Sequence, residues 1–134
     1  MNERLPKFKG KKLLAEIAKS TQGLIYISET DAQVEPFNAA NVDVKNILDL
    51  IPDDGLSETR EPREFFSRLT TVKDWFGARE KQRAKRFAAL ERLLTENLRD
   101  LTVVRVGRIQ IDIYVVGLDD DNNLVGIKTK AVET

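Results

Sequence analysis

The sequence predicts an α+β fold, and three patterns support that prediction. Apolar residues recur at helical spacing in residues 11–20 and again in residues 87–98. Residues 109–116 begin with a strict alternation of apolar and polar side chains, which is the period of a half-buried strand. At 134 residues, the chain 1–134 is expected to be a single domain that folds without a disulfide or a metal.

The first third of the chain predicts a helix and then a strand. Residues 11–20 form an amphipathic helix that Gly23 is expected to end. The short apolar run 24–27 predicts a buried strand, and the polar residues 28–31 predict a loop after it. Residues 42–51 fit either a helical turn or part of a strand, and the sequence leaves both open.

The middle of the chain predicts a turn, a short helix and a long helix. Residues 52–55 (Pro-Asp-Asp-Gly) predict a turn, and the polar segment 52–61 is expected to be the most mobile part. A short helix is expected to start at Glu61-Pro62. Thr71 and Asp74 have the spacing of a helix N-cap, so the long helix is expected to run from there to about residue 98. Its core-facing stripe is Phe87, Leu90, Leu94 and Leu98.

The last third predicts two antiparallel hairpins. Residues 103–106 and 109–116 flank Gly107-Arg108, which is expected to form a tight turn. Residues 119–123 (Asp-Asp-Asp-Asn-Asn) predict a second turn before a final strand over 125–131. This acidic run lacks the glycine and the closing glutamate of a twelve-residue calcium loop, so we interpret it as a polar hairpin tip.

Composition excludes several classes of function. The chain contains no cysteine and no histidine. This excludes disulfides, thiolate zinc sites and nucleophiles that a histidine activates. We therefore expect a protein that is not an enzyme and has no cofactor or metal of its own. No run approaches the ~18 apolar residues of a membrane span, so we expect a cytoplasmic protein with no membrane partner.

Charge is balanced overall but unevenly distributed. Lys+Arg and Asp+Glu number 22 each, whereas residues 29–58 carry eight acids and one base. Residues 60–92 carry ten bases and five acids, so we expect a dipolar molecule. A basic face on the long helix could contact phosphate, but the pattern favours an ordinary solvated helix face. Its residues are Arg79, Lys81, Arg83, Lys85 and Arg86.

Four residues are ordinary when each is taken alone, but together they are candidates for a partner-binding site. Trp75 is the only tryptophan, and at a helix start it is either a half-buried packing residue or an interface anchor. Asp74 precedes it. Glu29 lies just past a predicted strand end, and Thr134 follows the final predicted strand directly, which would hold its α-carboxylate in place.

Three stretches resemble the nuclease A inhibitor family. They are Ser20 to Glu29 (STQGLIYISE), Phe65 to Trp75 (FFSRLTTVKDW) and Val104 to Thr134. Residues 30–64 match less well. The resemblance implies an α/β/α sandwich around a mainly antiparallel sheet. It also implies a protein that binds one-to-one to a Mg²⁺-dependent, sugar-non-specific nuclease of the ββα-metal type. The sequence gives no clear reason to expect a homodimer, so we expect a monomer when the protein is free.

The same resemblance implies a role for each candidate residue. Glu29 would enter the cleft of the nuclease, and the α-carboxylate of Thr134 would reach its Mg²⁺ directly or through water. Asp74 and Trp75 would anchor the contact beside it. Mg²⁺ prefers oxygen ligands, and acidic groups speed association with a basic cleft.

The chain departs from the family after the Asp-Trp pair, where family members carry acidic residues and this chain carries the basic residues of segment 79–86. Two alternatives therefore stand beside the inhibitor. One is an interaction module of the same fold with a different protein target. The other, ranked last because direct nucleic-acid binding is not expected, is a nucleic-acid binder that uses the basic helix.

Overall fold

The computed structural model describes residues 8–42, 46–51 and 56–134. Within these residues it contains three α-helices, two short 3₁₀ helices and seven strands. In chain order they are α1 (Gly10–Thr21), β1 (Ile25–Ile27), β2 (Asp31–Gln33), β3 (Glu35–Asn38), η1 (Ala39–Asn41), η2 (Ile47–Leu50), β4 (Ser57–Arg60), α2 (Pro62–Thr70), α3 (Ala78–Asn97), β5 (Arg99–Val106), β6 (Gln110–Leu118) and β7 (Leu124–Val132).

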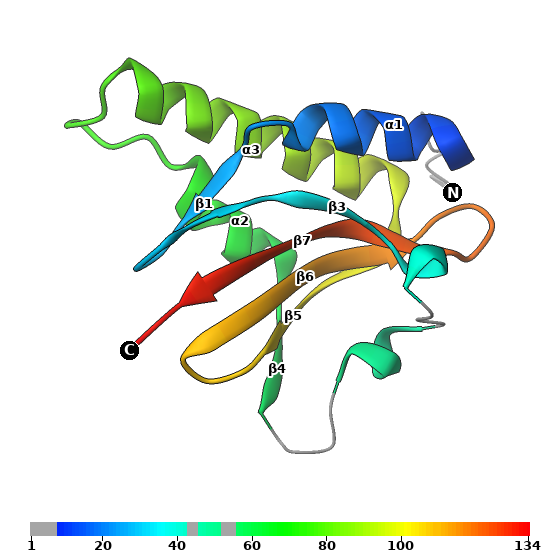
Figure 1. Ribbon diagram of the computed structural model, residues 1–134. Coiled ribbons are helices and arrows are strands. Elements are labelled where there is room, and N and C mark those ends of the chain that lie inside the picture. Colours follow the sequence, from blue (N-terminus) through cyan, green and yellow to red (C-terminus); the bar gives the residue numbers. More distant parts are fainter. Residues whose placement is uncertain (1–7, 43–45, 52–55) are drawn as a thin grey trace.

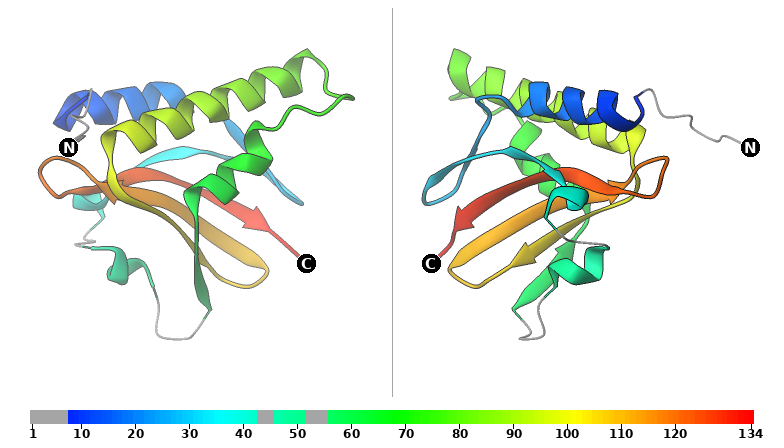
Figure 2. Two further views of the ribbon diagram at one scale, coloured as in Figure 1. Left: turned by 180° about the vertical axis from the view of Figure 1, so that it is seen from behind. Right: turned by 45° about the vertical axis from the view of Figure 1, so that its right-hand side comes forward.

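A five-stranded antiparallel sheet forms the centre, and its strand order is β3-β7-β6-β5-β4. Helices α1, α2 and α3 cover one face, as Figures 1 and 2 show. The other face is covered near one end by η1 and η2. The predicted α+β class with a mainly antiparallel sheet is confirmed, and short 3₁₀ helices form the second outer layer.

The main core lies between the sheet and the three helices. The predicted stripe of α3 is buried, with Phe87, Leu90 and Leu94 at most 1% exposed and Leu98 at 7%. Strand β6 meets this core with Ile111, Ile113 and Val115. Because side chains alternate across a strand, Val116 points to the opposite face, where it packs with Phe37 and Leu124 under η1 and η2.

The β5–β6 hairpin reverses at Gly107, as the sequence predicts, but its loop is wider than the predicted tight turn, because Val106 pairs with Asp112. Gly107 has φ +116, and a Cβ there would lie 2.2 Å from the carbonyl oxygen of Gln110. Only glycine accommodates that conformation and that approach without strain. The glycine therefore determines where the chain reverses between β5 and β6.

The long helix starts later than the sequence predicts. Helix α3 begins at Ala78, not between residues 71 and 74. The Thr71 hydroxyl donates to the carbonyl oxygen of Ser67 at 2.7 Å, so Thr71 closes α2 instead of capping α3. Asp74 and Trp75 consequently lie in the connecting loop between the two helices.

Three further segments differ from the prediction or resolve it. Residues 57–60, expected to be mobile, form the edge strand β4, and the turn predicted at 52–55 lies outside the described residues. Strand β1 is half-buried, not buried, because it pairs only with β2 in a separate hairpin. For residues 42–51 the sequence left a helical turn and a strand as alternatives. This segment contains the 3₁₀ helix η2, which begins with a capping box at Asn46.

Replacing Phe87 with alanine should lower the free energy of unfolding by about 3–5 kcal/mol, because it leaves a cavity between α3 and the sheet. Trp75→Ala is the matched aromatic control. Its side chain is 73% exposed, so we expect a change within about 0.5 kcal/mol. Urea unfolding of both variants checks this, and equal effects would contradict the assignment of Phe87 to the core.

Candidate functional site

The segment that follows β7 is held from two sides. The Glu133 amide donates to the carbonyl oxygen of Ile109 at 2.9 Å, beside the β5–β6 turn. On the other side, the Val132 amide donates to the Ser28 hydroxyl at 3.0 Å, and the Glu29 amide donates to the Val132 carbonyl at 3.3 Å. These bonds attach the turn of the β1–β2 hairpin to the end of β7.

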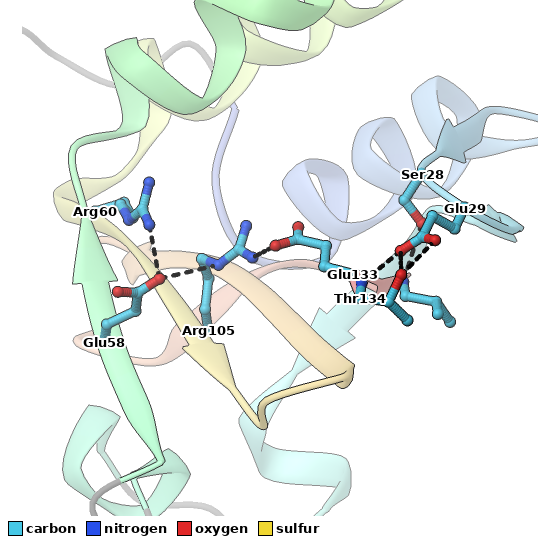
Figure 3. A network of polar contacts seen from close by, with 8 residues as sticks. Ser28, Glu29, Glu58, Arg60, Arg105, Glu133 and Thr134 are labelled. Carbon is cyan, nitrogen blue, oxygen red and sulfur yellow. Dashed lines mark hydrogen bonds and ion pairs between the residues drawn. The ribbon is translucent and has the colours of Figure 1, made fainter.

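Glu29 and Thr134 are brought into direct contact by this attachment. The Glu29 carboxylate accepts hydrogen bonds from the Thr134 amide at 2.5 Å and from the Thr134 hydroxyl at 2.8 Å (Figure 3). Both residues are exposed. Thus two of the four predicted site residues meet although 105 positions separate them in sequence.

A second polar network ends at the same place and centres on Arg105. Its side chain is only 12% exposed, and its Nη2 lies 2.7 Å from Glu133 Oε1. Its Nε lies 3.3 Å from Glu58 Oε1, which also accepts a 2.8 Å bond from Arg60 (Figure 3). The Nε contact has ion-pair distance but not hydrogen-bond geometry. The network connects the edge strand β4 to the segment after β7.

The sequence did not predict Arg105 as a site residue. It lies two positions after the buried Val103 and opposite Ile113 of β6, so its side chain leaves the sheet on the core face. Burial alone would lower the pKa of the guanidinium, but the hydrogen bond and charge of Glu133 outweigh that and raise the pKa. Arg105 therefore stays positive and holds Glu133.

Tyr26 lies beside Arg105 at one side of this network. Its ring stacks on Phe65 of α2 at 5.8 Å between centroids. Burial raises the pKa of its hydroxyl, and the nearby positive charge of Arg105 only partly opposes that rise. A hollow of about 620 Å³ opens beside these residues. Its lining is Tyr26, Arg60, Arg63, Glu64, Phe65, Ser67, Arg68, Leu69 and Arg105.

The Asp74-Trp75 pair occupies an exposed turn. The Phe76 amide donates to the carbonyl oxygen of Lys73 at 3.0 Å, which closes the turn. Trp75 is 73% exposed and contacts Phe76 edge to face at 4.8 Å. Trp75 is thus not a half-buried packing residue. A large exposed aromatic ring is typical of an interface.

The loop containing Trp75, the β1–β2 turn and the end of β7 all lie at one end of the molecule in the three views of Figures 1 and 2. Hydrogen bonds join Glu29 to Thr134. Within the described ranges, no hydrogen bond or ion pair joins either of them to Asp74 or Trp75. The four predicted residues therefore lie in two separate groups, Glu29 with Thr134 and Asp74 with Trp75.

Comparison with known protein families supports the resemblance seen in the sequence. The model of the nuclease A inhibitor-like protein family matches residues 11–134. The chain belongs to this family. A search of curated proteins finds no match.

In this nuclease A inhibitor-like protein, the acidic run after β6 is a hairpin tip, as predicted. Asp119 Oδ1 accepts hydrogen bonds from the amides of Asp121 and Asn123 at 2.8 and 2.9 Å. In the parts of the chain that the structure describes, no group of three or more acidic residues is arranged to hold a metal ion. None of the helices described there has the length and apolar character that crossing a membrane requires.

Replacing Tyr26 with phenylalanine should make the protein less sensitive to alkali. The unfolded chain loses the tyrosine proton near the ordinary pKa of 10.0, whereas the folded chain keeps it to higher pH. The stability that this proton contributes is therefore complete below pH 10 and is lost as pH rises through the raised pKa. Urea unfolding from pH 8 to 11 should show that the free energy of unfolding decreases less steeply for Tyr26→Phe than for the wild type.

Tyr114 still contributes in that variant, because burial and then Asp112 raise the pKa of its hydroxyl as well. The decrease in the free energy of unfolding at alkaline pH should thus be smaller in the variant but not absent. Identical slopes for wild type and variant would contradict the burial of the Tyr26 hydroxyl.

Replacing Glu29 with alanine should release Thr134 without unfolding the protein. Two hydrogen bonds are lost at an exposed site, so we expect the unfolding free energy to change by about 1 kcal/mol or less. The heteronuclear NOE of the Thr134 amide should fall sharply. Glu35→Ala, which removes an exposed glutamate from β3, is the control and should leave that NOE unchanged.

Proposed function

We propose that this protein inhibits a Mg²⁺-dependent, sugar-non-specific nuclease of the ββα-metal type by filling its active site in a one-to-one complex. Membership of the nuclease A inhibitor-like family supports a nuclease as the partner. The observation that carries the proposal is the contact between Glu29 and Thr134, which arranges acidic groups at an exposed end of the molecule.

The chemistry of that contact suits a metal-dependent nuclease. In such an enzyme Mg²⁺ binds the substrate phosphate and keeps positions open for oxygen ligands. The α-carboxylate of Thr134 would take one of these positions, directly or through a water molecule. The amide and hydroxyl of Thr134 are already bonded to Glu29, so little conformational freedom is lost on binding.

Asp74 and Trp75 would form the second contact point. A 73% exposed tryptophan can bury a large rigid surface, and truncating such a residue in an interface often costs 2 kcal/mol or more, as an order of magnitude. Asp74 places a negative charge beside it for a basic cleft. Two separated contacts would fix the orientation of the inhibitor as well as its affinity.

The test is a titration of the purified protein into a Mg²⁺-dependent ββα-metal nuclease that is digesting plasmid DNA. Inhibition should reach completion at one equivalent. Trp75→Ala and a form with four extra residues after Thr134 should each weaken inhibition by at least about tenfold. The extension acts by moving the α-carboxylate.

Two controls match these variants. Leu48→Ala truncates another exposed apolar side chain, 71% exposed on η2, and should inhibit like wild type. The same four residues added before Met1 should have no effect. An extension after Thr134 that leaves inhibition unchanged would remove the metal-binding role of the carboxylate.

Full nuclease activity at every molar ratio of this protein to nuclease would count against the proposal. It would favour the alternative in which the same fold binds a different protein target. The lack of enzymatic activity, the absence of a cofactor, the monomeric free state and the cytoplasmic location remain predictions from the sequence.

A further inference from the structure

A groove of about 690 Å³ lies between the β1–β2 hairpin and the first half of α3. It is separate from the Glu29–Thr134 contact and from the Arg105 network. Its lining is Gly23, Leu24, Ile25, Ile27, Asp31, Ala78, Arg79, Gln82, Arg83 and Arg86.

The hairpin side of the groove is aliphatic apart from one charged residue, Asp31. Ile27 is 46% exposed, and Ile25 beside it is half-buried. Exposed apolar surface inside a concave groove is typical of a site that another molecule covers.

The helix side of the groove is positively charged. Within the described ranges, the side chains of Arg79 and Arg83 make no hydrogen bond and no ion pair. Arg86 differs, because its Nη2 donates to the carbonyl oxygens of Ser20 at 3.0 Å and Gln22 at 2.6 Å. Arg86 thus tethers the end of α1, while Arg79 and Arg83 remain available to a ligand.

The groove also lies between the two contact points of the proposed inhibitor surface. The hairpin that forms one wall carries Glu29 in its turn. The helix that forms the other wall begins at Ala78, three residues after Trp75. A partner that touched both contact points would pass over this groove.

We propose that the groove binds an extended segment of the partner protein that combines acidic and aliphatic side chains. Its carboxylates would pair with Arg79 and Arg83, and its apolar side chains would cover Ile27. This inference rests on the proposed function only in taking the partner to be the inhibited nuclease. A nucleic acid fits less well, because the described residues that line the groove include no aromatic ring on which bases could stack.

The first experiment uses a defined probe and needs no nuclease. A fluorescein-labelled peptide of alternating Asp and Leu is titrated with the protein, and anisotropy is recorded at low and moderate salt. The double variant Arg79→Glu with Arg83→Glu should bind it at least about tenfold more weakly, since like charges then face each other.

The matched control is Lys81→Glu with Lys85→Glu. It reverses the same two charges on the same helix, but neither residue lines the groove. Its affinity for the peptide should stay within about threefold of wild type. Circular dichroism should show both variants folded, because glutamate, arginine and lysine have similar helix propensity. A peptide of alternating Lys and Leu should bind the Arg79→Glu, Arg83→Glu variant better than wild type.

Three outcomes overturn the inference: no binding of the acidic peptide, equal losses in the two double variants, or binding of a single-stranded oligonucleotide in place of the peptide. The oligonucleotide result would assign the basic helix to nucleic acid.

The same variants in the nuclease titration separate this inference from the proposed function. If wild type inhibits and both double variants inhibit equally well, the function stands and the groove has no part in it. If wild type fails to inhibit but the acidic peptide binds the groove, the target is another protein. If neither occurs, both proposals are wrong.

Discussion

The interior position of β7 in the sheet is the constraint on which the site depends. The strand pairs with β3 on one side and β6 on the other, and its residues are buried against both cores. Its direction is therefore determined by two ladders of hydrogen bonds and by packing on two faces. The residues that follow β7 continue in the same direction. Thr134 is therefore held against Glu29 and does not become disordered.

Arg105 adds a charged connection to this arrangement. A buried guanidinium costs free energy unless acceptors surround it, so its two carboxylates are needed. One comes from the edge strand and one from the segment after β7. The pairing links the polar strand β4 to the end of the molecule that carries the site. In this way a short edge strand with little apolar surface contributes to the position of Glu133.

The proposed interface presents charges of both signs, and their placement is informative. Acidic groups lie at the end of β7 and beside Trp75, while free arginines line the neighbouring groove. A surface patterned in this way selects a partner with the complementary pattern and rejects one that is uniformly basic. In the proposed interface Arg79 and Arg83 would contribute to specificity, whereas Lys81 and Lys85 lie outside the groove.

Local sequence determined the elements whose residues interact mainly with their chain neighbours. The stripe of α3, the alternation of β6 and the turn at Gly107 follow from helical period, strand period and glycine conformation. Local patterns did not determine β4, whose polar residues form a strand only because β5 offers an edge.

The exposure of Trp75 was likewise decided by tertiary structure, since Thr71 closes α2 and delays the start of α3. The contacts of Glu29 with Thr134 and of Arg105 with Glu58 and Glu133 join residues far apart in the chain. No short pattern encodes such pairs, because their distances depend on how the sheet and the hairpin pack together.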